Sequence, residues 1–292
     1  EEVIWMIVNI SGYRFVDLPD RDALRGQTLD FCMEIDLKGT VLLSHNGINF
    51  FLAGTEESTD KFVSFLDSDE RLSGIPLKVS HSDYQPFRRM LVKCKREIIS
   101  LGMDEIRPSE FTGPYISPKE LKHILDDGQE ILLLDTRNDY ETRLGTFEGA
   151  LDLGISSFRQ FPDAIGDLPD EYKSMTLVMY CTGGIRCEKA SAVMLKAGFE
   201  DVRQLEGGIL GYFEECGGTH WEGDCWELSD GTWECEGWRE SPPIFEGNHT
   251  FNLSIADLEA GNSYRLRAEL NTNTWNGHDH FHESNYYYIN NF

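Results

Sequence analysis

The sequence predicts a mixed α/β protein built from two sheets that a short linker joins. Three observations lead to this prediction. Two wholly apolar runs, residues 131–134 and 177–180, are typical of parallel strands covered on both faces. An Asn46-Gly47 pair between two other apolar runs predicts an antiparallel hairpin in the N-terminal third. Residues 107–116, which contain proline and glycine, separate these two regions and predict the linker.

The N-terminal part, residues 1–106, has the element order of a ferredoxin-like sheet. Hydrophobic patterns predict helices within 20–31 and 58–66, and strands at 3–10, 41–44, 48–53, 77–80 and 90–93. A β-α-β-β-α-β order fits a ferredoxin-like α+β domain. Small sheets of this kind serve many functions, so this fold alone implies no chemistry.

Residues 117–228 predict a parallel-sheet α/β domain. A helix is predicted to begin after Ser117, which caps it, with Pro118 in its first turn and Glu120 as the capping-box acid. It is predicted to end at 126–128, an Asp-Asp-Gly sequence. Strands near 131, 177 and 202 alternate with helical stretches, which is the pattern of a β-α-β series. Residues 229–292 predict a short β-rich or irregular C-terminal extension, because 251–255 and 264–270 alternate like strands.

The stretch after the second apolar run combines a cysteine, a glycine loop and an arginine. Cys181 follows a predicted strand, where open α/β sheets bind ligands. Gly183 and Gly184 allow backbone N–H groups to converge, and a helix is predicted to begin near Cys187. These amides and the Arg186 charge would lower the pKa of the Cys181 thiol and make it nucleophilic. A buried structural cysteine is the alternative, and it needs neither feature.

These residues resemble the active-site loop of a rhodanese domain, in 178–181 followed by 184–186. Residues 132–141 are similar to the strand and Asp-x-Arg segment of that domain, and 198–208 to its closing strand and glycine turn. The run 181–191 resembles more specifically the UPF0176 group, the oxygen-dependent tRNA wobble-uridine hydroxylases of the TrhO type.

This resemblance spans roughly residues 3–228 and implies an enzyme that modifies tRNA. It implies a tRNA-binding N-terminal domain, a rhodanese-like catalytic domain, the anticodon region of tRNA as partner and molecular oxygen as co-substrate. Cys181 would be the catalytic nucleophile that forms 5-hydroxyuridine. The active-site loop would be Thr182, Gly183, Gly184, Ile185 and Arg186. No flavin, haem or iron motif is visible, so no cofactor is evident from the sequence. A site of two histidines and one carboxylate stays open, because its ligands are scattered in sequence.

One departure from the rhodanese pattern affects the expected chemistry. The usual Gly-His-Ile-x-Gly-Ala segment reads Gly-Thr-Phe-Glu-Gly-Ala here, with Thr146 in place of the histidine. A Cys–His pair is therefore not predicted at this position, and activation of Cys181 rests on the loop amides, the helix end and Arg186. The UPF0176 group has the same Thr-Phe pair in this resemblance.

Three further residues are predicted to support the site. Asp135 and Arg137 follow the first buried strand and would either reach the cysteine loop or brace the domain, with bracing favoured for Asp135. Cys187 would either resolve an oxidised Cys181 as a disulfide or pack in the first helical turn, with packing slightly favoured.

A basic stretch in the N-terminal domain predicts a tRNA-binding surface. Its cations are Arg88, Arg89, Lys93, Lys95 and Arg96, with no acid among them, and Lys93 and Lys95 would share one face of a strand. Phe87 or Tyr84 could stack on a base. The alternative is a solvated edge strand. A net charge of −25 disfavours nucleic acid on average, so the prediction depends on this local stretch and on the resemblance.

Composition predicts a cytoplasmic protein with no membrane or DNA partner. Seven cysteines, an odd number, indicate a reducing setting, and no run of eighteen apolar residues occurs. Residues 1–10 lack a basic region before their apolar run, so no signal peptide is expected. No Cys-x-x-Cys pair occurs, and the alternating His278, His280 and His282 are read as a polar tail rather than as a metal site.

Three other functions remain open from the loop itself. A sulfurtransferase would carry sulfane sulfur as a Cys181 persulfide. A phosphatase of the rhodanese fold would need one more residue between Cys181 and Arg186 to enclose phosphate, since only four lie there. A tRNA-binding module without catalysis would not need an intact Cys181 and Arg186.

Overall fold

The computed structural model describes residues 7–222, 225–227 and 233–235. The described chain forms two compact units. One contains the residues up to Thr112 together with Glu188–Val193, and the other contains Gly113–Cys187 and the residues from Met194 onward. Among the described residues, no helix has the length and apolar character needed to cross a membrane.

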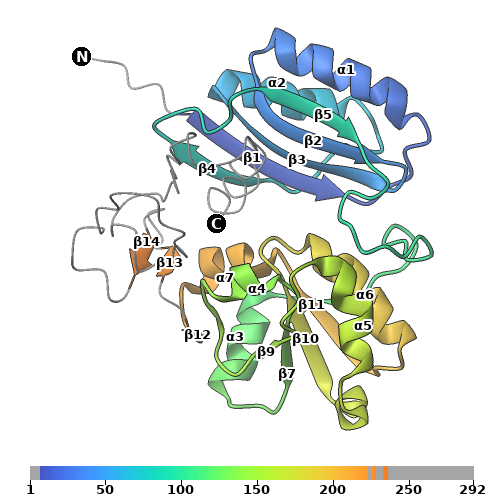
Figure 1. Ribbon diagram of the computed structural model, residues 1–292. Coiled ribbons are helices and arrows are strands. Elements are labelled where there is room, and N and C mark those ends of the chain that lie inside the picture. The colour runs from blue at the N-terminus through green and yellow to red at the C-terminus, as the bar shows by residue number, and fades with distance from the viewer. Residues whose placement is uncertain (1–6, 223–224, 228–232, 236–292) are drawn as a thin grey trace, which may run out of the picture. The chain divides into compact units, whose positions relative to one another are not determined.

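The first unit is a five-stranded sheet with two helices, and it confirms the ferredoxin-like prediction. The strand order is β4-β1-β3-β2-β5. Its first four strands pair antiparallel, and β5 adds to β2 in parallel at one edge. Figure 1 labels its elements: β1 (Ile7–Arg14), α1 (Arg21–Glu34), β2 (Lys38–Ser44), β3 (Gly47–Gly54), α2 (Glu56–Asp67), β4 (Lys78–Ser82) and β5 (Met90–Cys94).

The predicted hairpin is the connection between β2 and β3. Ser44 pairs with Gly47 across a two-residue turn. Gly47 has a φ of +145°, and a Cβ there would collide with the Arg14 carbonyl oxygen of β1. A glycine is therefore required for the turn and for the approach of β1 to β3.

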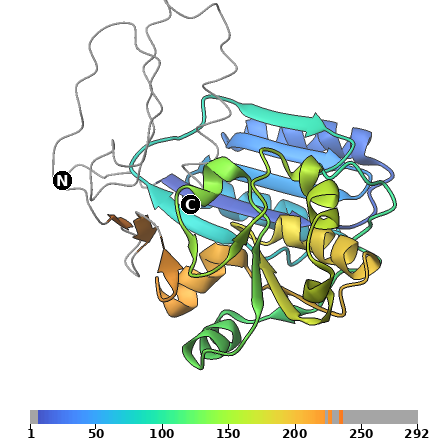
Figure 2. The ribbon, with the colours of Figure 1, turned by 60° about the horizontal axis from the view of Figure 1, so that its bottom comes forward.

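Both helices of this unit lie on the same face of the sheet (Figures 1 and 2). Phe31 of α1 stacks on Phe65 of α2 with ring centroids 4.7 Å apart. Phe62 of α2 meets Phe50 of β3 edge-on at 5.3 Å. Burial of these apolar side chains between the helices and the sheet holds the unit together.

The second unit is built on a parallel sheet with the order β6-β11-β10-β7-β9, as the two apolar runs predicted. Its elements are β6 (Tyr115–Ile116), α3 (Pro118–Asp126), β7 (Leu132–Asp135), α4 (Asp139–Thr142), β8 (Thr146–Phe147), β9 (Leu151–Asp152), η1 (Phe158–Gln160), α5 (Phe161–Gly166), η2 (Asp170–Ser174), β10 (Thr176–Tyr180), α6 (Ile185–Lys196), β11 (Asp201–Leu205) and α7 (Gly208–Cys216). Two short pairs follow: β12 (Trp221–Glu222) with β8, and β13 (Cys225–Glu227) with β14 (Trp233–Cys235).

Strand β10 is the central strand of this sheet, and both of its faces are covered. Val178 and Tyr180 belong to the apolar cluster that includes α3 and α7. Leu177 and Met179 alternate with them and face the opposite side, where α5 and α6 lie in Figure 1. Burial on both faces explains why this strand has no polar side chain from Leu177 to Met179.

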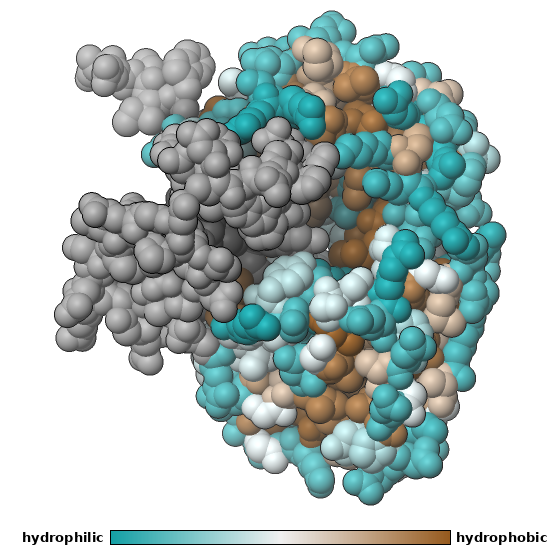
Figure 3. Space-filling view, in the orientation of Figure 1, coloured by the Kyte–Doolittle hydropathy of each residue, from teal (hydrophilic) through white to brown (hydrophobic). Residues whose placement is uncertain are grey.

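The local start and stop signals of the second unit act largely as the sequence predicts. Ser117 accepts a hydrogen bond from the Glu120 amide at 3.2 Å, and α3 ends at Asp126. Helix α6 begins at Ile185, two residues before the position predicted from the apolar spacing. In the view of Figure 3, hydrophilic residues lie mostly along the outline of each unit, and apolar residues show between them.

Part of the predicted C-terminal extension lies outside the described residues. The predicted strands at 251–255 and 264–270 and the three alternating histidines His278, His280 and His282 fall in this part. The domain boundaries predicted at 106, 117 and 228 stay predictions.

Candidate active site

Cys181 directly follows β10, so the central parallel strand delivers it to the carboxyl edge of the sheet. The loop from Cys181 leads into α6. The Gly184 amide donates to the Cys181 Sγ at 3.1 Å. The Cys181 side chain is only 1% exposed, so the sulfur lies below the protein surface. Its surroundings are nevertheless polar, because backbone N–H groups face it.

The pKa of the Cys181 thiol is lowered from its ordinary value. Burial raises the pKa, but a hydrogen bond from the Cys187 side chain, the Arg186 charge and the amides of Arg186 and Cys187 lower it, to about 6. Burial alone raises the pKa of Cys32 to about 12. At neutral pH Cys181 is therefore mainly a thiolate, the nucleophilic form.

Helix α7 supports the loop from behind. The Ile209 amide donates to the Cys181 carbonyl oxygen at 3.0 Å, and the Leu210 amide donates to the Thr182 carbonyl oxygen at 3.1 Å. Gly208 has a φ of +62°, and a Cβ there would lie 2.6 Å from the Thr182 oxygen and 2.8 Å from the Gly184 nitrogen. The glycine turn recognised in the sequence thus allows α7 to press its first amides against the loop.

Arg186 is held by a carboxylate that sequence reasoning missed. Its Nη1 and Nη2 atoms donate to Glu141 Oε1 and Oε2 at 3.0 and 2.7 Å. The same carboxylate accepts from the Thr182 hydroxyl at 3.2 Å and from the Asn138 amide at 3.1 Å. Among the described residues, the buried Arg186 Nε has no hydrogen-bond partner. Glu141 therefore connects two residues of the active-site loop to α4.

A local signal for Glu141 was present in the sequence. Asn138 and Glu141 form a capping box around the start of α4, which is the Asn-x-x-Glu pattern of a helix N-terminus. The helix has only four residues, so no hydrophobic periodicity revealed it. The pairing with Arg186, 45 positions later, could not be read from that pattern.

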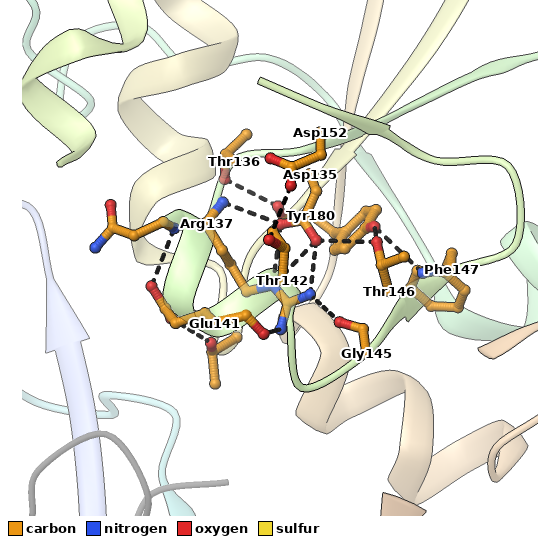
Figure 4. Close-up of polar contacts among 12 residues, drawn as sticks. Asp135, Thr136, Arg137, Glu141, Thr142, Gly145, Thr146, Phe147, Asp152 and Tyr180 are labelled. Carbon is orange, nitrogen blue, oxygen red and sulfur yellow. Dashed lines mark hydrogen bonds and ion pairs between the residues drawn. The ribbon is translucent and has the colours of Figure 1, made fainter. Parts of the chain in front are cut away.

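Asp135 and Arg137 form a buried ion pair that braces the unit. Arg137 is 1% exposed, and its Nη2 lies 2.6 Å from Asp135 Oδ2. Its guanidinium also donates to the carbonyl oxygens of Glu141 and Gly145 (Figure 4). The pair therefore fixes the backbone of α4 and of the segment after it.

Thr146 occupies the position where a rhodanese pattern has histidine, and it belongs to the same buried network. Its hydroxyl lies 2.6 Å from the Tyr180 hydroxyl and donates to Asp135 Oδ2 at 3.1 Å (Figure 4). Thr146 therefore contacts Asp135, which braces the unit, and Tyr180 at the end of β10.

Cys187 lies in the first turn of α6 and is fully buried. Its Sγ is 3.6 Å from the Thr136 hydroxyl, which donates its own proton to the Tyr180 carbonyl oxygen at 2.9 Å. The single S–H proton of Cys187 can then go to the Thr136 oxygen or to the Cys181 sulfur. A thiolate is the stronger acceptor because it is charged. Both cysteines are free rather than joined in a disulfide.

The predicted basic residues lie on and next to β5, at one edge of the first unit's sheet. Arg88 and Arg89 are exposed before β5, and Lys93 is exposed on it. Strand β5 ends at Cys94, and the Lys95 amide still donates to the Leu43 carbonyl oxygen of β2 at 2.7 Å. Lys93 and Lys95 are both exposed, and their shared face stays a prediction. Arg96 forms an exposed ion pair with Asp104.

Helix α1 brings two further cations to this edge, and sequence reasoning missed both. Arg21 Nη1 donates to the Lys95 carbonyl oxygen at 2.7 Å, and Arg25 Nε donates to the Val92 carbonyl oxygen at 3.0 Å. These bonds occupy carbonyl groups at the outer edge of β5 and add positive charge there.

Within the described ranges, no group of three His, Cys, Asp or Glu side chains is placed to hold a metal ion.

Two family models match the chain. Residues 7–98 match the UPF0176 acylphosphatase like domain, and residues 117–215 match the rhodanese-like domain. Among solved structures, the rhodanese-like domain of an Anabaena sp. protein is similar at 21% identity over 49% of this chain and 99% of that chain, with a TM-score of 0.33. The domain assignment rests on the family models and the sheet topology rather than on this likeness.

Curated relatives match across both domains. A protein of Ralstonia nicotianae named tRNA uridine(34) hydroxylase is 50% identical over 224 residues, which is 75% of this chain and 79% of that protein. Proteins of the same name from Thiobacillus denitrificans and Delftia acidovorans are each 47% identical, over 75% and 77% of this chain and 90% and 87% of those proteins. This identity and coverage show that the chain belongs to the tRNA uridine(34) hydroxylase family, with a UPF0176 domain followed by a rhodanese-like domain.

Proposed function

We propose that this protein hydroxylates the wobble uridine of tRNA to 5-hydroxyuridine, with molecular oxygen as co-substrate and Cys181 as the catalytic nucleophile. The names of the relatives support the reaction. The observation that carries the role of Cys181 is its place at the end of the central strand, where the Gly184 amide donates to its sulfur and the pKa is lowered to about 6. A thiolate at neutral pH is the reactive form of cysteine.

The loop residues would stabilise negative charge on the sulfur and on any species bound to it. The Gly184 amide already donates to the sulfur. Within the described chain the Arg186 Nε is a buried donor without a partner, so it is suited to receive an anionic sulfur or oxygen species. Cys187 would support the thiolate as a donor, while Asp135 and Arg137 would position α4 and, through it, Glu141.

The anticodon region of tRNA would bind the basic edge of the first unit. Exposed cations attract phosphate regardless of sequence, even on a protein of net negative charge, when they are gathered locally. The residues proposed here are Arg88, Arg89, Lys93, Lys95 and Arg96, with Arg21 and Arg25 added by the structure. A tRNA substrate would place the reaction in the cytoplasm.

The decisive experiment replaces Cys181 with serine in cells that depend on this protein for 5-hydroxyuridine. Mass spectrometry of tRNA nucleosides should show loss of 5-hydroxyuridine, because a serine hydroxyl is not ionised at neutral pH. Cys94→Ser is the matched control, since its thiol is part-exposed and has a raised pKa. An unchanged level of 5-hydroxyuridine in the Cys181→Ser cells would disprove the proposal.

A sulfurtransferase is the second candidate function, and the same loop supports it. A persulfide on Cys181 would also be anionic and would suit the Gly184 amide and the Arg186 Nε. The two functions differ in their product. Transfer of sulfur from thiosulfate to an acceptor by the wild type, together with normal 5-hydroxyuridine in cells lacking the protein, would favour the sulfurtransferase.

A further inference from the structure

An exposed aromatic ring stands beside the residues that hold the active-site loop. Tyr140 lies on α4 and is 38% exposed, whereas Asn138 and Glu141 near it are buried. Glu141 binds both Arg186 and Thr182 of the loop. Tyr140 is close enough to Arg186 to raise the pKa of that guanidinium further. The Tyr140 ring is thus an exposed aromatic surface on α4, the helix that the loop residues Thr182 and Arg186 hold through Glu141.

The position of this ring is set by a hydrogen bond. Asn138 Nδ2 donates to the Tyr140 hydroxyl at 2.8 Å. Asn138 is 8% exposed, and its backbone amide donates to the Glu141 side chain. Its side chain also belongs to the capping box at the start of α4, so the amide group that holds the Tyr140 hydroxyl is itself fixed.

We propose that Tyr140 is the residue on which the target uracil stacks, held in position by Asn138. This inference rests on the proposed function and names the substrate contact within it. An enzyme that modifies a base must take that base out of its stack, and an aromatic ring replaces the lost stacking. The carbonyl oxygens of Cys181 and Thr182 are not available to a base, because the first amides of α7 donate to them.

A photocrosslink tests this contact directly. The full chain is mixed with a tRNA anticodon stem-loop that carries 4-thiouridine at the wobble position and is then irradiated. Mass spectrometry of the digest should place the crosslink on Tyr140. A crosslink confined to residues outside 138–142 would overturn the inference.

Binding of the same stem-loop gives a second measure. Tyr140→Leu should weaken binding about tenfold or more, whereas Tyr140→Phe, which keeps the ring, should stay within about threefold of wild type. Tyr115→Leu removes another exposed aromatic, 52% exposed on β6, and should change binding little. Equal losses at Tyr140 and Tyr115, or no loss in Tyr140→Leu, would overturn the inference.

Failure of this inference can be told apart from failure of the proposed function. The pH dependence of Cys181 alkylation should be the same in Tyr140→Leu as in wild type, which shows that the loop is intact. If cells that carry Tyr140→Leu in place of the wild type keep a normal level of 5-hydroxyuridine, while Cys181→Ser cells lose it, only the stacking role is wrong. If Cys181→Ser cells keep 5-hydroxyuridine, the proposed function is wrong, and a crosslink on Tyr140 would still support the base contact.

Discussion

Glu141 and Arg186 form a buried ion pair with two parallel hydrogen bonds, at 3.0 and 2.7 Å. Their side chains are 2% and 8% exposed. Arg137 in turn holds the backbone of α4 through the Glu141 carbonyl oxygen. Because Glu141 offsets part of the Arg186 charge, the lowered pKa of Cys181 also requires the loop amides and the Cys187 side chain.

Removing the charge of Glu141 should destabilise the protein. Glu141→Gln leaves the Arg186 guanidinium buried without its counter-ion, which is expected to cost about 3–5 kcal/mol of unfolding free energy. Urea denaturation measures this loss. Asp139→Asn is the matched control in the same helix, because its 3.4 Å pair with Arg143 is largely exposed and should contribute less than about 1 kcal/mol. Equal effects of the two substitutions would contradict the bracing role of Glu141.

Cys181 should titrate well below an ordinary thiol. Its folded pKa of about 6 lies below an unfolded value of about 8.5, so the ionised thiol stabilises the folded state fully above about pH 8.5. This stabilisation is lost as the pH falls toward 6. The stability difference between wild type and Cys181→Ser should therefore grow from pH 6 to 8.5, as measured by urea unfolding at each pH.

Alkylation gives an independent check on the same thiol. The rate at Cys181 should rise through pH 6 and level off by about pH 8, whereas Cys32, with a pKa of about 12, should still react slowly there. Because the Cys181 side chain is 1% exposed, the shape of the profile is the readout rather than the absolute rate. A midpoint near 8.5 would mean that the loop does not stabilise the thiolate.

The sequence predicted the parts of this fold that local patterns determine. The hairpin depends on a glycine at position 47, and the central strand depends on a run of apolar side chains buried on both faces. Cys181 was identified because it directly follows that strand and precedes two glycines. Each of these signals lies within a few residues, so each could be read without tertiary contacts.

The remaining parts of the site depend on contacts between distant segments. Glu141 meets Arg186 across 45 positions, and it lies on a helix too short for a hydrophobic period. The burial of Cys181 depends on how closely α7 approaches its loop.

Gly208 should be sensitive to even one added methyl group. In Gly208→Ala the new Cβ would lie 2.6 Å from the Thr182 oxygen and 2.8 Å from the Gly184 nitrogen, so the loop must move. The expected result is loss of 5-hydroxyuridine and a Cys181 alkylation midpoint shifted toward higher pH. Gly217→Ala is the control, since Gly217 has a similar φ of +65° but open space around its Cβ position. If both variants behave alike, backbone strain rather than crowding of the loop explains the effect.

Charge reversal at the basic edge of the first unit should weaken tRNA binding. Arg88 and Arg89 are exposed and precede β5. In the double variant Arg88→Glu and Arg89→Glu, the slope of log K against log salt concentration should become shallower by roughly 1 to 2 units, because fewer counterions are released. Filter binding of tRNA at several salt concentrations measures this slope.

The control for this experiment is Lys61→Glu, which reverses one charge rather than two, at an exposed position on α2. A surface that attracts tRNA only through overall charge would respond equally to a reversal anywhere, after allowance for the number of charges changed. A localised phosphate contact responds only where the cations touch the backbone, since salt screens exposed charges beyond about 10 Å. A steeper or unchanged slope in the Arg88 and Arg89 variant would therefore place the tRNA surface elsewhere on the protein.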